Sequence, residues 1–443
     1  MGNTATFALL IAFLISTLFI GIIASRKEDT EGYLIANRRL NTFQSVMTIC
    51  GSFIGAMSLL VYPAFVFTYG ISAMWIFIGY LLGFICFTFF AVYLKKYQSS
   101  QKFYTMTDYF LHRFGKRTAF WVMIVIFTTY FGGSTAQFIG SGKILSELTG
   151  LTYKTSLLSI MGIMVIYLLL GGFKSVVKTD VFQFIVLVIL LVIIAFVLRM
   201  GTQVPITHLN PFNAGPVYIT AFLLLGLLGL FAGQDYWQKV YAMKDEKVVK
   251  KSFVLSGILL CLVAIILTYI GLVARTQFSS IDPDLAVLYS FTRLMPHELT
   301  GLVSVAFFAA ILSSADTNLF MLGLNLTNDI LQVQKNKRNY TRIAVAGIGG
   351  ASLLLALNFN NLVDLVIVIK SIGLILPPIV LFIWFTKGDT TGIICSIVLT
   401  SVLVMGFALS GFLRPELAFV AIFGSGLFYW AAVGIRRLMS KTD

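Results

Sequence analysis

Long apolar stretches with few charges recur along the whole chain, and they constrain its fold more than any other feature. Many exceed about 18 residues, which is long enough for a helix to cross a hydrocarbon core of about 30 Å. Charged residues make up 11% of the 443 residues, whereas a soluble globular protein carries roughly 25%. The sequence therefore predicts an all-α polytopic membrane protein and excludes a water-soluble fold.

Thirteen predicted spans of about 20 residues account for most of the sequence. No soluble domain or long linker interrupts them, so we expect a single transmembrane domain over residues 1–443. The predicted spans are 4–25, 41–68, 71–94, 118–145, 155–172, 179–200, 216–234, 252–274, 300–324, 342–358, 362–385, 390–411 and 416–437.

Lys and Arg outnumber Asp and Glu by 14, but the basic residues lie between the spans and not on one face. When alternate loops are assigned to one side of the membrane, most cations fall on that side, among them Arg38, Lys174 and Lys239. The positive-inside rule then places the N terminus outside and the C terminus in the cytoplasm. We therefore expect a multi-pass protein of the plasma or inner membrane that contacts lipid and binds no nucleic acid.

Groups of residues that carry enzyme chemistry are missing from the sequence. The three histidines have no metal-ligand spacing, and no glycine-rich phosphate loop precedes a lysine. We therefore expect neither catalysis nor a cofactor.

The second span contains residues that interrupt helices. Gly51 and Gly55 lie in its interior, and Pro63 follows eight residues after Gly55. Glycine weakens a helix and proline removes one of its hydrogen bonds, so an unwound segment with free carbonyl oxygens is one interpretation. Close packing of helices through small residues is the other.

The ninth span carries hydroxyl groups on one face. Ala310, Ser313, Ser314 and Thr317 follow the i, i+3, i+4 spacing, so one carbonyl and three hydroxyls can converge there and offer oxygens to a monovalent cation. Hydroxyls can also bond back to their own helix. Asp316 makes this second interpretation weaker, because a carboxylate at membrane depth costs roughly 2.5–3.5 kcal/mol unless it faces water, a cation or a partner.

Other polar residues interrupt the apolar pattern, and each has two interpretations. Thr179 is placed as a helix N-cap with Asp180 in the first turn, and capping can be its whole role. Lys370 lies within the eleventh span, where it either balances the charge of a carboxylate or snorkels to an interface. Gln137 donates a hydrogen bond either to a substrate or to a neighbouring helix.

Motifs across nearly the whole chain resemble those of the sodium:solute symporter family. The two main ones link the fifth and sixth spans and occupy the ninth span. They are Gly171-Gly172-x-x-x-Val176-x-x-Thr179-Asp180-x-x-Gln183 and Ala310-x-x-Ser313-Ser314-Ala315-Asp316-Thr317. A further match is Gln234-Asp235-Tyr236-Trp237-Gln238.

The resemblance implies a leucine-transporter-like core of two inverted five-helix repeats with broken helices. Spans 2–6 (about 41–200) would form the first repeat and spans 7–11 (about 216–385) the second, with one span before and two after. It also implies a sodium ion between the broken first core helix and the eighth core helix. Its ligands would be the carbonyl groups of Gly51, Ile54 and Ala310 and the hydroxyl groups of Ser313 and Ser314.

Some members of the family hold a second sodium with the acid of the first motif. Here Asp180, Ser313, Asp316 and Thr317 would form that site. The solute side departs from the family, because sugar-transporting members carry polar pairs where Ile369-Lys370 stands and proline transporters carry an acid where Phe53 stands. We expect the solute to contact Phe53, Gln137 and Lys370.

The resemblance implies a sodium-coupled symporter that imports a small organic solute by alternating access. The cation at Lys370 favours a carboxylate or a zwitterion. Two alternatives remain at this point: a membrane solute sensor without net transport, and a symporter coupled to protons through Asp316 or Asp180.

Overall fold

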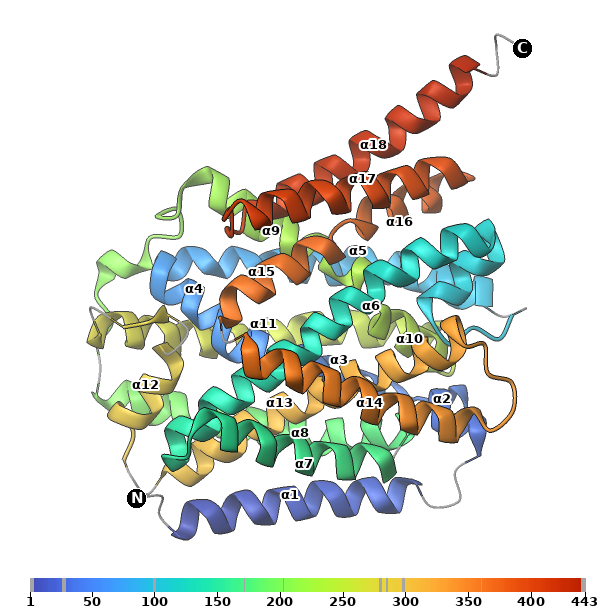
Figure 1. Cartoon of the computed structure of the whole chain (residues 1–443). Helices are drawn as coiled ribbons and strands as arrows, with labels where there is room; N and C mark the ends of the chain where they lie inside the picture. The colour runs from blue at the N-terminus through green and yellow to red at the C-terminus, as the bar shows by residue number, and fades with distance from the viewer. Residues whose placement is uncertain are drawn as a thin grey trace.

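The computed structural model describes residues 4–25, 29–98, 101–170, 172–201, 203–278, 281–283, 286–296, 299–359 and 361–439. Within these ranges the chain is helical, and its only β-type pairing is one isolated bridge between Leu40 and Met243. The helices form one bundle (Figure 1). In it, α1 (Thr4–Ser25) lies along one side, and α17 (Thr390–Leu409) and α18 (Leu417–Met439) lie along the opposite side.

Each predicted span corresponds to one or two helices in the described residues. The other bundle helices are α3 (Thr42–Phe53), α4 (Tyr62–Tyr69), α5 (Trp75–Gln98), α6 (Met106–Thr149), α7 (Tyr153–Leu170), α8 (Phe173–Gly201), α9 (Gly215–Ala232), α10 (Gln234–Ala242), α11 (Glu246–Gln277), α13 (Thr300–Leu324), α14 (Lys337–Asn358), α15 (Leu362–Gly373) and α16 (Leu376–Phe385). Two short helices, α2 (Thr30–Ile35) and α12 (Ala286–Leu294), lie at its ends. In the described ranges, ten helices are long and apolar enough to cross a membrane, fewer than the thirteen expected.

The second predicted span is interrupted in its middle. Helix α3 ends at Phe53, and Ile54 leaves the helical conformation with φ −89° and ψ 89°. A π-helical turn, Met57–Val61, then leads into α4, whose second residue is Pro63. A proline can occupy the first turn of a helix without losing a hydrogen bond there. The interruption that the glycines and proline suggested is therefore present.

A second break, which the sequence analysis did not foresee, lies at the end of the seventh predicted span. Gly233, with φ −80° and ψ 102°, separates α9 from α10. Helix α10 continues to Ala242, so Lys239 does not lie in a loop as predicted but is fully buried in the bundle. The prediction failed because Asp235, one turn earlier, forms an ion pair with Lys239 and makes its burial possible.

Helix α8 begins earlier than predicted. It starts at Phe173, so Thr179 lies in its second turn and not at an N-cap. The Thr179 hydroxyl instead donates to the carbonyl oxygens of Ser175 (3.0 Å) and Val176 (2.9 Å) in its own helix. The capping interpretation of Thr179 is therefore wrong. Gly171, at the start of the same motif, lies outside the described residues.

Helices α5 and α9 approach each other so closely that their backbones nearly touch. A Cβ atom on Gly226 would lie 2.6 Å from the backbone nitrogen of Tyr80 and 2.8 Å from the carbonyl carbon of Gly79. Small residues permit such close packing in membranes, where dispersion contacts replace the hydrophobic effect as the force between helices.

We expect Gly226→Ala to lower the thermal stability of the purified protein. The added methyl group would overlap the α5 backbone, and overpacking of this kind costs about 1–3 kcal/mol. Gly434→Ala in α18 is the matched control, because a Cβ atom there meets nothing within 4 Å. Thermal unfolding in detergent measures both, and equal unfolding temperatures for the two variants would contradict the close contact.

Candidate functional site

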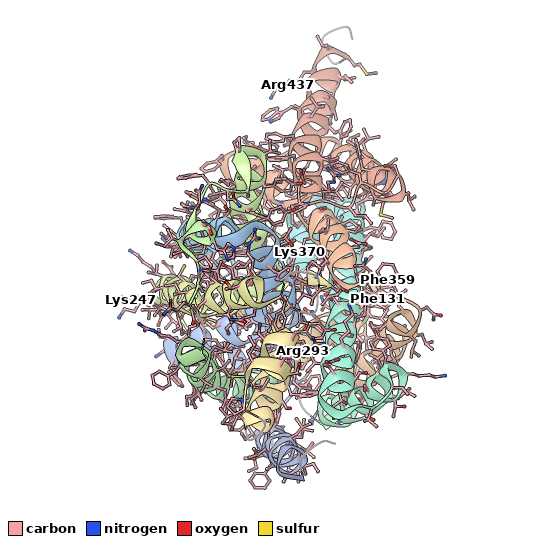
Figure 2. The ribbon with its side chains drawn as sticks, turned by 90° about the vertical axis from the view of Figure 1, so that its left-hand side faces the viewer. Phe131, Lys247, Arg293, Phe359, Lys370 and Arg437 are labelled. Carbon is pink, nitrogen blue, oxygen red and sulfur yellow. The ribbon has the colours of Figure 1, made fainter. Side chains whose placement is uncertain are left out.

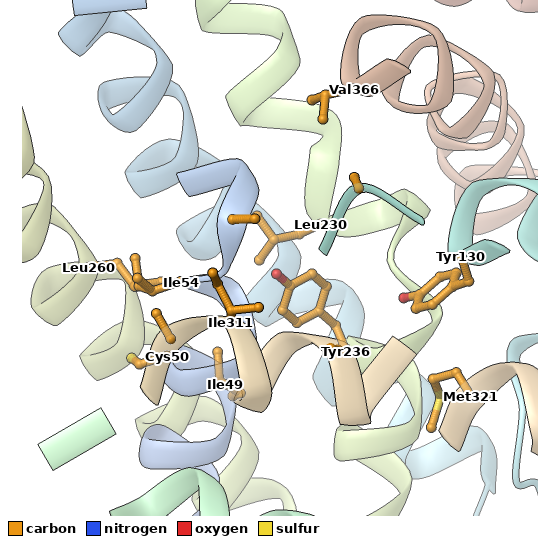
Figure 3. Close-up of a cluster of buried hydrophobic side chains, with 14 of the residues drawn as sticks. Ile49, Cys50, Ile54, Tyr130, Leu230, Tyr236, Leu260, Ile311, Met321 and Val366 are labelled. Carbon is orange, nitrogen blue, oxygen red and sulfur yellow. The ribbon is translucent and has the colours of Figure 1, made fainter. Parts of the chain in front are cut away.

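The break in α3 lies directly against α13. A Cβ atom on Gly51 would lie 2.9 Å from Ser313 Oγ, and one on Gly55 would overlap the side chain of Ser314. Figure 3 shows Ile49, Cys50 and Ile54 of this segment beside Ile311 of α13. Glycine is therefore required at both positions by the close approach of α13.

Side chains from two neighbouring helices and from the turn after the break bond to the backbone groups that the break leaves without helical partners. Ser314 Oγ donates to the carbonyl oxygen of Ser52 at 2.9 Å, and Ser58 Oγ donates to that of Phe53 at 2.8 Å. The backbone N–H of Ala56 donates to Gln137 Oε1 at 2.8 Å. Of the two interpretations of Gln137, the contact between helices is thus observed, although with Gln137 as the acceptor.

Asp180 connects three helices at the same level. Ser313 Oγ of α13 donates to Asp180 Oδ1 at 2.5 Å, and Thr48 Oγ1 of α3 donates to Asp180 Oδ2. The Asp180 side chain is fully buried. Two hydroxyl donors therefore balance a carboxylate of α8 next to the break in α3.

The residues predicted to bind sodium lie on the two facing segments. All five are buried, and the structure brings Gly51 against Ser313 and the carbonyl of Ser52 against Ser314. Of the four residues predicted for a second cation, Asp180 and Ser313 are hydrogen-bonded to each other. Thr317 instead lines a cavity beside the break, and Asp316, the preceding residue, is buried.

A cavity of about 190 Å³ opens beside the break. Phe53, Gln137 and Lys370, the three residues expected to contact solute, all contribute to its wall. Other polar or aromatic groups in the wall include Ser52, Tyr80, Tyr130, Asp235, Tyr236, Thr317 and Asn318. The wall thus presents one cation and one carboxylate among aromatic rings and hydroxyls.

Lys370 projects from α15 towards the centre of the bundle (Figure 2). Within the described part of the chain, its ammonium group makes no hydrogen bond or ion pair, and Asp235 is the charged group that acts on it electrostatically. The side chain is partly exposed to the cavity. A negatively charged group of a ligand would find an available partner there.

A wider and more polar cavity of about 900 Å³ adjoins the first one. The two share the wall residues Phe65, Ile367 and Pro415. The wider cavity reaches Glu147, near the C-terminal end of α6, and Arg414, between α17 and α18. It therefore lies between the inner cavity and one end of the bundle.

A buried ion pair connects the inner cavity to the break in α3. Lys239 Nζ lies 3.0 Å from Asp235 Oδ2 and also donates to Ser52 Oγ. Tyr130 Oη donates to Asp235 Oδ1 at 2.5 Å. The Lys239 side chain is 1% exposed and the Asp235 side chain 13%. Polar contacts therefore run without interruption from Tyr130 through Asp235, Lys239 and Ser52 to Ser314.

The sequence analysis assigned no part in the binding site to Tyr130, Asp235, Lys239 or Thr48. A signal was available for one pair, because Asp235 and Lys239 are four residues apart and oppositely charged, the spacing of an ion pair on one helical face. Thr48 and Tyr130 gave no comparable signal, since each bonds to a residue more than 100 positions away.

Comparison with known proteins identifies relatives of this arrangement. A model of the sodium:solute symporter family matches residues 33–400. The sodium/proline symporter of Staphylococcus aureus strain Newman is 24% identical over 430 residues, which covers 88% of this chain and 83% of that protein.

Two solved structures share the fold. A substrate-bound, outward-open Na⁺-coupled sialic acid symporter superposes with a TM-score of 0.83 at 17% identity, covering 97% of each chain. A closed nucleobase-cation-symport-1 family transporter gives 0.61 at 15% identity, covering 92% of this chain and 94% of that one. The leucine-transporter-like fold inferred from the motifs is thereby confirmed.

We expect Lys239→Gln to destabilise the protein strongly, because it leaves the Asp235 carboxylate buried without its cation. Breaking one partner of a buried pair costs about 3–5 kcal/mol. Arg436→Gln is the control, since it removes a pair of similar length (2.6 Å) whose arginine is 62% exposed, and such pairs contribute about 0–1 kcal/mol. Thermal unfolding compares them, and the double variant Asp235→Asn/Lys239→Gln should recover part of the loss. Similar effects of Lys239→Gln and Arg436→Gln would argue against a buried pair.

Proposed function

The chain belongs to the sodium:solute symporter family and is a sodium-coupled solute symporter, and we propose that it imports a small carboxylate or zwitterion by alternating access. The observation that carries this proposal is the inner cavity, whose wall presents Lys370 and Asp235 beside the break in α3. Freed carbonyls and helix ends near the midplane are the usual means by which transporters bind ions and solutes.

We propose that the chain crosses the membrane thirteen times, with the N terminus outside. The count of ten treats Met57–Gln98 as one helix of 42 residues, which at 1.5 Å per residue is about twice the thickness of the hydrocarbon core. That count also leaves out α1, of which Ala8–Ala24 is apolar, and α7. The distribution of Lys and Arg over the loops supports this orientation.

Two inverted repeats would organise the core, with spans 2–6 in one and spans 7–11 in the other. The breaks support this division, because they fall in the second and seventh predicted spans. These are the first spans of the two proposed repeats, and paired interruptions in corresponding positions mark the binding site of such transporters.

The coupling sodium would bind between α3 and α13, with the five ligands that the motifs imply. The contact of Gly51 with Ser313, and of Ser52 with Ser314, supports this assignment. Carbonyl and hydroxyl oxygens suit a hard monovalent cation, and the break frees carbonyls for it. Asp180 and Ser313 would serve a second cation, with Asp316 and Thr317 as its more distant members.

The solute would place a carboxylate against Lys370 and, where it is a zwitterion, its cationic group towards Asp235. Proline and sialic acid, the solutes named for two relatives, both carry a carboxylate. The aromatic side chains of Phe53, Tyr80 and Tyr236 would cover its apolar part. The cavity volume of about 190 Å³ favours a small molecule over a sugar chain or peptide.

Binding of sodium and solute would be coupled through Ser52. Its hydroxyl accepts from Lys239, its carbonyl accepts from Ser314, and the residue lines the solute cavity. A solute charge that attracts Asp235 therefore acts on Lys239 and, through it, on the segment that would hold sodium. Coupling of this kind is reciprocal, so sodium would strengthen solute binding by the same factor.

We expect Ser313→Ala and Ser314→Ala to weaken sodium binding about tenfold or more, because each removes an oxygen ligand of a charged ion. Ser352→Ala in α14 is the control, since this buried serine has no hydrogen-bond partner in the described residues. Sodium-dependent uptake of labelled amino acids and monocarboxylates into proteoliposomes measures the effect. Unchanged uptake in both variants would refute the site.

Uptake driven by a pH gradient without sodium would favour proton coupling, and solute binding without flux would favour a sensor.

We expect Lys370→Gln to weaken solute binding about tenfold or more while it changes sodium binding little. The lost contact is a charge-assisted hydrogen bond, which contributes about 1.5–3 kcal/mol. Lys247→Gln, at the exposed start of α11 (Figure 2), is the control. Binding of labelled solute and labelled sodium to the purified protein separates the two effects. Equal loss of both would indicate a structural ion pair instead.

A further inference from the structure

A third, strongly basic hollow lies at the end of the bundle where α3 and α8 begin. Its volume is about 230 Å³, and its wall includes the side chains of Arg39, Lys174 and Lys178 together with the amides of Asn37 and Gln44. No acidic residue lines it. In the part of the chain that the structure describes, none of the three cations forms an ion pair. The hollow therefore presents three positive charges to one small volume.

The backbone beside the hollow is held in an unusual conformation. Ala36, Asn37 and Arg38 all have positive φ angles, of 50°, 54° and 56°. Residues other than glycine rarely adopt this region, and successive residues do so at a cost of roughly 1–2 kcal/mol each. This turn joins α2 to the segment before α3 and brings Arg39 to the same wall as the two lysines of α8. Such strain concentrates at ligand-binding segments.

Helix α8 continues the hollow into an apolar surface. Lys174 and Lys178 are one turn apart, and the 3.6-residue period places both on one face with Ile185, Ile189, Val192 and Phe196. These four apolar side chains are 42%, 54%, 51% and 65% exposed. One face of α8 thus carries two cations at its start and an exposed apolar stripe further along the helix.

We propose that this hollow binds the phosphate group of an anionic phospholipid, with an acyl chain along the stripe of α8. The phosphodiester would contact Arg39, Lys174 and Lys178, which match its charge and its oxygen acceptors. A free phosphate ion would satisfy the cations but not use the apolar stripe, which is why a lipid is the source to which the structure points. Phe43, next to Gln44 and 55% exposed, extends the apolar surface at this end of α3.

The lipid would act on the centre of the molecule through α8. Asp180 follows Lys178 by two residues and bonds to Thr48 of α3 and Ser313 of α13. Arg39 precedes α3 by three residues. A bound headgroup would therefore hold the beginnings of α3 and α8 together, and these two helices meet again at Asp180. The inference concerns lipid binding alone and does not depend on the proposed solute or on the sodium site.

The test compares the full-length protein with the triple variant Arg39→Gln/Lys174→Gln/Lys178→Gln. The control, Lys247→Gln/Lys250→Gln/Lys251→Gln, removes the same charge from exposed positions of α11. Each protein is purified in detergent and titrated with phosphatidylglycerol, with phosphatidylcholine, or with inorganic phosphate. Retained lipid is counted by native mass spectrometry, and the unfolding temperature is measured in the same samples.

We expect phosphatidylglycerol to bind and stabilise the unaltered protein and the α11 control. The Arg39/Lys174/Lys178 variant should bind phosphatidylglycerol at least about tenfold more weakly. Its unfolding temperature in phosphatidylcholine should stay unchanged. Ile189→Ser should weaken the binding of phosphatidylglycerol without changing any stabilisation by inorganic phosphate. Equal stabilisation by inorganic phosphate would identify a free-anion site and overturn the lipid assignment. An equal loss in the α11 control would show that only the overall charge matters.

Discussion

A backbone N–H or C=O group that leaves a helix at membrane depth must find another partner, because no water is available there. This requirement determines the arrangement at the centre of the molecule. Helix α3 can end at Phe53 because Ser58, Gln137 and Ser314 bond to groups near the break. The same contacts attach α3 to α6 and α13, and the inner cavity opens where they meet. The break therefore lacks hydrogen bonds within its own helix, and side-chain hydrogen bonds replace them.

Charged side chains in the bundle follow the same rule. Asp235 is paired with Lys239, and Asp180 accepts from two hydroxyl groups. Lys370 differs, because in the described residues its ammonium group has no such partner and faces the cavity. A charge is costly at membrane depth unless it is paired or hydrated. The ammonium group of Lys370 therefore marks the place in the cavity where an anionic ligand group is most stabilised.

Local patterns predicted much of this arrangement. The break in α3 follows from Gly55 and Pro63, which act on their own helix, and the hydroxyl face of α13 follows from spacing along one helix. The continuation of α10 could not be predicted from hydropathy, since a lysine resembles a loop residue when its partners are out of view. Ser52, one of the partners of Lys239, is 187 residues away in sequence. Helix α8 was predicted to start late because Lys174 and Lys178 resemble loop residues, although they lie within its first two turns and line a hollow.

Ser52 is the residue through which the separate parts of the centre constrain one another. Its hydroxyl binds the cation of the buried pair, its carbonyl binds α13, and its side of α3 lines the cavity. A shift of α3 that opens the contact with Ser314 must also move the partner of Lys239, and a ligand that draws Asp235 towards the cavity acts on the same lysine. Packed and hydrogen-bonded elements tend to switch between discrete arrangements and do not deform continuously. Occupancy of the cavity and the position of α3 are for this reason linked by geometry, before any particular ion or solute is considered.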